Sequence, residues 1–294
     1  MKAFLKHIGL LSIVIVVLLC VLDLAYTWVY EHSDPRNKTQ FILSLKESDT
    51  LDYVFLGSSR VENTIVTSKI KALTDKTVLN LGTQGAKLDD VNIFLQLLLS
   101  RNIKINKVFI QVDYLFNFES SSDIVRSQSL PFIRKHSIIK TYLQKTDSSF
   151  NLNYYLPFYR YAKNDYRVGF REFVASSINR KAVVNFNDGF LPLYGKMKSS
   201  SISTLPKTIL KQNKSFDIID SICRKNKIDV IYFCAPFCQN LKNRDYVDSL
   251  KIRIPNFKDF SEVVTNNALF QNCSHLNEEG ANYFTELLIK ELKL

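Results

Sequence analysis

The stretch "VFLGSSRVENTI", residues 54–65, decides the interpretation of the fold. An apolar run ends on Gly57, Ser58 and Ser59, and apolar residues at helical spacing follow. This pattern predicts a buried strand that turns directly into a helix. The two serines have two interpretations. A serine at a helix start commonly caps the helix. Alternatively, the serine is a nucleophile, because the free N–H groups at a helix start stabilise the negative charge that develops on the substrate when it is attacked.

Strand and helix patterns alternate on both sides of this stretch. "KTVLNLG", "KVFIQVDY" and "IDVIYFCAPF" are further strand patterns, and "LDDVNIFLQLLLSRN", "FDIIDSICRKNK" and "EEGANYFTELLIKELKL" are helix patterns. Continuous apolar strands between helices predict a parallel sheet covered on both faces, in an α/β/α fold. Ligands of such sheets bind beyond the carboxyl ends of the strands. The post-strand residues Gly57 to Ser59, Gly82 to Gly85, Asp113 to Asn117 and Pro236 should therefore gather on one edge.

The first thirty residues predict a membrane anchor. Lys2 and Lys6 precede an apolar run that extends to Val29 if Asp23 lies near its far end, which is long enough to span a bilayer. A cleaved signal peptide is the alternative, but no clear A-x-A cleavage site is present. The basic residues before the run predict a cytoplasmic N-terminus and an exported remainder.

The rest of the chain predicts a linker and one α/β domain. We assign residues 1–30 to the anchor, 31–50 to a juxtamembrane linker and 51–294 to the α/β domain. Between about 120 and 210 the alternation breaks, and tyrosine, phenylalanine and arginine are frequent. We interpret this part as a helical insertion, which either packs over the sheet edge or forms a lid or groove for a sugar or an anionic polymer.

The net charge and the cysteine spacing indicate which binding partners and cofactors the chain could have. The net charge of +11 favours anionic partners, but the basic residues are scattered and the exported topology disfavours nucleic acid. The cysteines form no CxxC pair, so we expect neither a zinc site nor another cofactor. Cys234 and Cys238 either pair in an oxidising compartment or remain buried free thiols. The oligomeric state is not indicated.

A serine nucleophile needs a base, and His275 lies in the loop "NCSHLNEEGANYF" before the last helix. "GSS" after the first strand, "NLGTQGA" after the second and "SHLNEEGA" before the last helix together resemble the SGNH (GDSL-like) hydrolase superfamily. Membrane-anchored bacterial proteins with a "GSSR" block look closest. The resemblance implies a flavodoxin-like fold with Ser59 as the nucleophile and Ser58 at the usual aspartate position. It also implies His275 as the base and the amides of Ser59 and Gly82 as oxyanion donors.

The sequence departs from the family pattern at two places. The third block of the family carries Gly-x-Asn-Asp, whereas this chain has "IQVDYLFNF", with Asp113 about where the glycine would stand. Asn117 is the substitute that we consider for the missing asparagine, and Asp113 is alternatively structural. Asn272 replaces the aspartate three residues before the histidine. The chain could therefore use a Ser–His dyad, recruit another carboxylate, or have weak or no catalysis.

The resemblance covers residues of about 51–118 and 215–294, leaves the insertion unexplained, and implies two functions. The first is a bacterial membrane-anchored serine esterase or O-acyltransferase that acts on acyl groups of envelope or surface polysaccharide. The second is a catalytically impaired relative that binds or scaffolds polysaccharide-modifying machinery. Arg60 either steadies an anionic group of the substrate or is an exposed helix arginine.

Overall fold

The computed structural model describes residues 1–198 and 201–294, which form two compact units. The anchor unit comprises residues 1–40 and 123–182, and the sheet unit comprises residues 41–122 and 183–294. Residues 123–182 of the anchor unit thus lie between the two segments that form the sheet unit. Of the insertion expected at about 120–210, residues 123–182 belong to the anchor unit, and residues 183–198 and 201–210 are grouped with the sheet unit.

The sheet unit is built on five parallel strands. They are β1 (Thr50–Leu56), β2 (Val78–Asn80), β3 (Lys104–Gln111), β5 (Asp229–Cys234) and β7 (Phe257–Asp259), in the order β2-β1-β3-β5-β7. The predicted parallel sheet is confirmed, although β7 was not among the predicted strands. The strand order reverses between β1 and β3, and this switch point is where α/β sheets place their ligand crevice.

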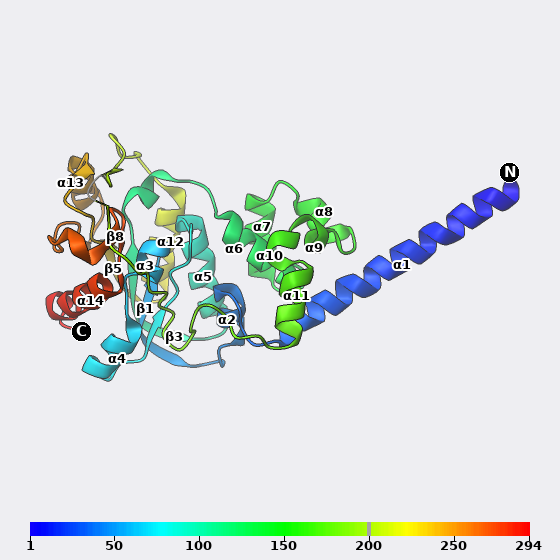
Figure 1. Cartoon of the computed structure of the whole chain (residues 1–294), viewed down its shortest axis with the longest axis horizontal. Helices are drawn as coiled ribbons and strands as arrows, with labels where there is room; N and C mark the ends of the chain where they lie inside the picture. The colour runs from blue at the N-terminus through cyan, green and yellow to red at the C-terminus, as the bar shows by residue number, and fades with distance from the viewer. Residues whose placement is uncertain (199–200) are drawn as a thin grey trace. The chain divides into compact units, whose positions relative to one another are not determined.

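Helices cover both faces of this sheet and confirm the three layers. The helices are α3 (Ser59–Glu62), α4 (Thr67–Thr74), α5 (Leu88–Ser100), α12 (Lys214–Lys225), α13 (Asp245–Arg253) and α14 (Glu278–Leu292). Helices α5 and α12 pack together on one side of the strands, and α4 and α14 pack together on the other (Figure 1). Val54, Phe55 and Leu56 of β1 are all fully buried, as expected for a strand covered on both faces.

Short elements complete the sheet unit. They are the 3-10 helices η1 (Tyr114–Asn117) and η3 (Asn267–Leu269), the parallel pair β4 (Ser203–Thr204) and β6 (Leu241–Lys242), and the antiparallel pair β8 (Phe270–Asn272) and β9 (His275–Leu276). The β8–β9 hairpin carries His275 immediately before α14. Helix α2 (Lys38–Ser44) lies in the segment expected to be a linker.

The anchor unit consists of helices. They are α1 (Lys2–His32), α6 (Asp123–Ser129), η2 (Leu130–Phe132), α7 (Ser137–Thr146), α8 (Phe150–Tyr155), α9 (Tyr159–Lys163), α10 (Asp165–Val168) and α11 (Phe170–Ser177). Helix α1 is 31 residues long and predominantly apolar. It is compatible with a single-pass membrane anchor or a signal sequence.

The second half of α1 is part of the core of the anchor unit. Asp23, Tyr26 and Tyr30 are buried. Asp23 forms ion pairs with Arg134 and Arg160, and the ring of Tyr26 stacks on Phe173 at a centroid distance of 4.0 Å. The charge of the acidic residue that interrupts the apolar run is therefore balanced by Arg134, in the turn after η2, and by Arg160 of α9.

Candidate active site

The residues that follow β1, β3 and β5 meet at one edge of the sheet, as the strand pattern predicted. The Ser58 N–H after β1 donates to Gln111 Oε1 at the end of β3, at 2.9 Å. Arg60 Nη2 donates to the Ala235 carbonyl after β5, at 2.6 Å. Gly57 is required here because a Cβ atom on it would lie 2.7 Å from Gln111 Oε1 and 2.5 Å from Val61 Cγ2.

Ser58 caps the short helix α3. Its Oγ accepts from the Arg60 N–H at 3.2 Å and donates to Gln111 Oε1 at 2.8 Å. Its side chain is buried, with 2% of the residue exposed. The capping interpretation of the serine pair therefore applies to Ser58.

Ser59 has a different environment. It is the first residue of α3, where backbone N–H groups have no partner within the helix. Its Oγ lies 2.9 Å from His275 Nε2, although the two residues are 216 positions apart. The structure thus brings the predicted hydroxyl and imidazole to hydrogen-bond distance.

Asn272 determines which nitrogen of His275 carries the proton. Its Oδ1 lies 3.0 Å from His275 Nδ1. The amide is oriented because the Ser274 N–H donates to this Oδ1 at 3.0 Å, while Asn272 Nδ2 donates to Gln271 Oε1 at 2.6 Å. An oxygen facing Nδ1 assigns the proton to Nδ1 and leaves the lone pair of Nε2 for the hydroxyl of Ser59.

The surroundings of His275 keep it neutral. Burial of the ring, and next the positive charge of Arg60, lower the pKa of His275 to about 4. The imidazole is therefore unprotonated near pH 7 and can accept a proton. Asn272 supplies a hydrogen-bond acceptor but no negative charge to stabilise the imidazolium that would result.

Arg60 is neither exposed nor free for a substrate, so both sequence-based interpretations of it are wrong. It is fully buried, and its Nε donates to Asp113 Oδ2 at 2.7 Å. Nη1 donates to the Ser274 carbonyl, directly before His275, and Nη2 to the carbonyls of Ala235 and Pro236. The guanidinium also lies 3.5 Å from the ring centre of Phe237. Arg60 thus joins the serine helix to the histidine loop.

Gly82 and Asn117, which were predicted to be site residues, form hydrogen bonds with other parts of the protein. The Gly82 N–H donates to Asn80 Oδ1 at 2.9 Å, so it is not free to bind an oxyanion. Gly82 is required for packing, since a Cβ atom there would lie 2.3 Å from the Glu62 nitrogen. Asn117 donates to the Thr208 carbonyl at 2.7 Å and accepts from the Leu210 N–H and the Tyr246 hydroxyl. Its amide therefore holds a loop rather than replacing the missing asparagine.

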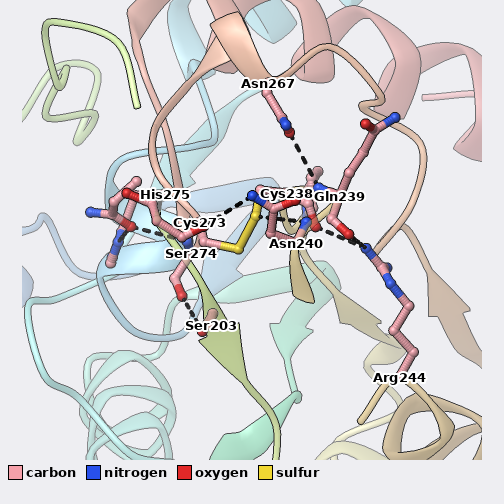
Figure 2. The surroundings of a disulfide bond; sticks show 12 residues. Ser203, Cys238, Gln239, Asn240, Arg244, Asn267, Cys273, Ser274 and His275 are labelled. Carbon is pink, nitrogen blue, oxygen red and sulfur yellow. Dashed lines mark hydrogen bonds between the residues drawn. A yellow bond between two sulfur atoms is a disulfide. The ribbon is translucent and has the colours of Figure 1, made fainter. Parts of the chain in front are cut away.

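A disulfide that sequence reasoning missed lies beside His275. Cys238 pairs with Cys273, while Cys234 is a buried free thiol, so the suggested Cys234–Cys238 pair is wrong. Figure 2 shows how the bond ties the segment after β5 to the strand-connecting turn that continues into Ser274 and His275. The Cys238 N–H also donates to the Cys273 carbonyl at 3.0 Å. A separation of 35 residues left no local spacing signal for this pair.

No protein-family model and no curated protein matches this chain. A solved structure described as "The structure of a putative platelet activating factor from Streptococcus pneumonia" is similar over 98% of each chain, with 12% sequence identity and a TM-score of 0.37. A likeness at this TM-score supports no conclusion about function.

Proposed function

We propose that the chain is a membrane-anchored serine esterase or O-acyltransferase with Ser59 as the nucleophile. The observation that carries this proposal is the hydrogen-bonded series from Ser59 Oγ to His275 Nε2 at 2.9 Å and from His275 Nδ1 to Asn272 Oδ1 at 3.0 Å. A nucleophile, a base and a group that orients the base form the arrangement required for acyl transfer.

The proposed reaction follows from these positions. Ser59 Oγ attacks an ester carbonyl while its proton passes to His275 Nε2. The Ser59 N–H at the start of α3 faces the developing oxyanion, which lies next to the attacking oxygen. His275 then gives the proton to the leaving alkoxide, and water or a sugar hydroxyl resolves the acyl-serine. With Gly82 engaged by Asn80, this oxyanion site has fewer donors than the family pattern implies.

The test is covalent labelling by a fluorophosphonate, which reacts with activated serines. We expect the natural chain to be labelled and the Ser59→Ala variant to lose the label. Ser58→Ala is the matched control, because Ser58 is the neighbouring serine but hydrogen-bonds Gln111 rather than the histidine. Equal labelling of the natural chain and of a Ser59→Ala variant with unchanged circular dichroism would refute the assignment of Ser59 as the nucleophile.

A second function has observations in its favour. Asn272 in place of a carboxylate, the lowered pKa of His275 and the engaged Gly82 N–H all weaken catalysis. We therefore retain a catalytically impaired chain that binds polysaccharide or its modifying machinery as the alternative. Absence of labelling in the natural chain, combined with binding to an acetylated polysaccharide, would favour this alternative.

The compartment is also part of the proposal. The Cys238–Cys273 disulfide supports an oxidising location for the sheet unit, in keeping with a cytoplasmic N-terminus and export of the remainder. The burial of Asp23, Tyr26 and Tyr30 by other helices supports retention of α1 as an anchor. Acyl groups on envelope polysaccharide are the substrates that we propose for such a location.

A further inference from the structure

Helix α1 provides a scale for depth in the membrane. Its residues up to Leu22 are exposed or half-exposed, and Asp23 is the first buried residue. About 20 helical residues at a rise of 1.5 Å each cover the roughly 30 Å of hydrocarbon in a bilayer. If α1 spans a bilayer, the boundary of the hydrocarbon on the far side falls near Asp23, because Tyr26 and Tyr30 beyond it are buried by protein. The 20 residues before Asp23 reach back to Ala3, so Lys6 lies close enough to the near surface for its side chain to extend to the head groups.

The partners of Asp23 show which part of the anchor unit lies at this boundary. The Phe158 N–H donates to Asp23 Oδ1 at 3.1 Å, and Arg134 pairs with the same carboxylate. Arg134 Nε also donates to the Tyr154 carbonyl at 2.9 Å. The end of α8 and the turn into α9 are thus level with Asp23, and hence with the lipid head groups.

Three apolar side chains are exposed along α8 and at the start of this turn. Leu152 is 48% exposed, Tyr155 71% and Leu156 46%, and we call these three residues the rim. Aromatic and aliphatic side chains of this kind are common where proteins meet the membrane interface. A bilayer would remove from water an apolar group that neighbouring helices leave uncovered.

The charge around the rim suits anionic lipid. Residues 123–182 contain eleven lysines and arginines and four aspartates and glutamates, a net charge of +7 within a chain of +11. Lys140 lies beside the rim, with its Nζ 4.7 Å from the ring centre of Tyr154. Basic residues near a membrane surface are attracted to anionic phospholipid head groups.

The same unit supplies a control position. The Asp34 N–H donates to Asn179 Oδ1 at 3.0 Å, so the end of α11 lies level with the residues just after α1. Ile178 there is 68% exposed, about as much as Tyr155. It lies about 15 Å further from the boundary, because some ten residues of α1 separate the two levels.

We propose that the rim inserts into the boundary between head groups and acyl chains of the leaflet from which α1 emerges, and that anionic phospholipid strengthens this contact. The occupant of this surface is thus the bilayer that holds α1, and the helices α8 and α9 rest on it. The proposal depends on the proposed membrane span, and the experiment below separates the two.

The test uses single tryptophans in the full-length chain. The protein has one tryptophan, Trp28, so a Trp28→Phe background receives Tyr155→Trp at the rim, Ile178→Trp as the control, or Leu11→Trp within the span. Each variant is placed in vesicles of brominated phosphatidylcholine with a minor fraction of phosphatidylglycerol. We expect the brominated lipid to quench Leu11→Trp and Tyr155→Trp but not Ile178→Trp, and acrylamide to quench Tyr155→Trp several-fold less than Ile178→Trp.

Each outcome decides the proposal. Quenching of Leu11→Trp by lipid, with Tyr155→Trp and Ile178→Trp equally accessible to acrylamide, would refute the rim contact and leave the span intact. Failure of Leu11→Trp to be quenched by lipid would refute both. Unchanged shielding of Tyr155→Trp in vesicles without phosphatidylglycerol would refute the preference for anionic lipid. Leu156→Trp repeats the measurement in case Tyr155→Trp disturbs the fold.

Discussion

The amide of Asn272 holds His275 in one tautomer but offers its imidazolium no counter-charge. In a Ser–His–Asp site, replacing the acid by asparagine costs about four powers of ten in turnover. We expect the reverse change, Asn272→Asp, to accelerate fluorophosphonate labelling at least ~10-fold, because a carboxylate there raises the basicity of the imidazole. Labelling kinetics at pH 7 measure this, with Asn266→Asp as a surface control. An unchanged rate would show that Asn272 is not coupled to the reaction.

The low pKa of His275 predicts how stability depends on pH. Burial and then Arg60 lower this pKa from 6.5 to about 4 in the folded chain. The unfolded chain therefore binds a proton below pH 6.5 that the folded chain excludes until about pH 4. We expect this contribution to be fully present above pH 6.5 and to fall by no more than about 3 kcal/mol as the pH drops to 4.

Urea unfolding at pH 7 and at pH 4.5 measures this loss. The His275→Gln variant is the control, because it lacks the titrating ring and should lose less stability between the two pH values. An identical loss in both proteins would mean that other groups determine the pH dependence.

Arg60 acts on the site through both charge and contacts, and two substitutions separate these effects. Arg60→Lys keeps the charge but cannot reach Asp113 and three carbonyls together, so we expect slower labelling with the pKa of His275 still low. Arg60→Met also removes the charge and leaves Asp113 buried without its partner, which should cost about 3–5 kcal/mol. The pKa of His275 should then rise, as measured by NMR titration. A pKa unaltered in Arg60→Met would contradict the electrostatic role.

At the scale of elements, the β8–β9 hairpin depends on a covalent link. Cys238 and Cys273 close a loop with a sequence separation of 35, and restricting such a loop in the unfolded chain stabilises the folded one by up to about 4 kcal/mol. We expect reduction to lower the denaturation midpoint in urea and to slow labelling of Ser59, because Cys273 lies two residues before His275. The Cys238→Ser/Cys273→Ser variant should behave like the reduced protein.

Cys223→Ala is the control for this change, since it removes a buried free thiol without breaking a disulfide. Reduced and oxidised protein with the same denaturation midpoint would contradict the stabilising role of the link. The same midpoint shift in Cys223→Ala would assign the effect to packing.

At the scale of the whole molecule, the anchor unit and the sheet unit are expected to respond separately to substitution. Asp23→Ala leaves Arg160, which is 1% exposed, without a carboxylate, and breaking such a buried pair costs about 3–5 kcal/mol. We expect faster proteolysis between residues 123 and 182, with labelling of Ser59 retained. Lys135→Ala, which breaks an ion pair whose lysine is 63% exposed, should change little. Loss of labelling in Asp23→Ala would show that the units are coupled.

Sequence patterns predicted much of the architecture because they report local periodicity and burial. The apolar runs around Val54 and Phe109 indicated β1 and β3, and glycines and polar residues marked where the strands end. Strand β7 was not predicted because its sequence, "FKD", is only three residues long and carries two charges. The family resemblance indicated Ser59 and His275, which the structure brings together, but it could not show that Asn80 engages the Gly82 N–H.

The sequence by itself determined the layered α/β fold, the apolar first helix and the two residues worth pairing, because hydrophobic spacing and residue type are local properties. Only the tertiary structure decided that Arg60 is buried against Asp113, that Cys238 pairs with Cys273, and which helices surround Asp23. These partners are distant along the chain. Which charge becomes neutralised, and which thiol meets which, depends on how the strands and loops come together in space.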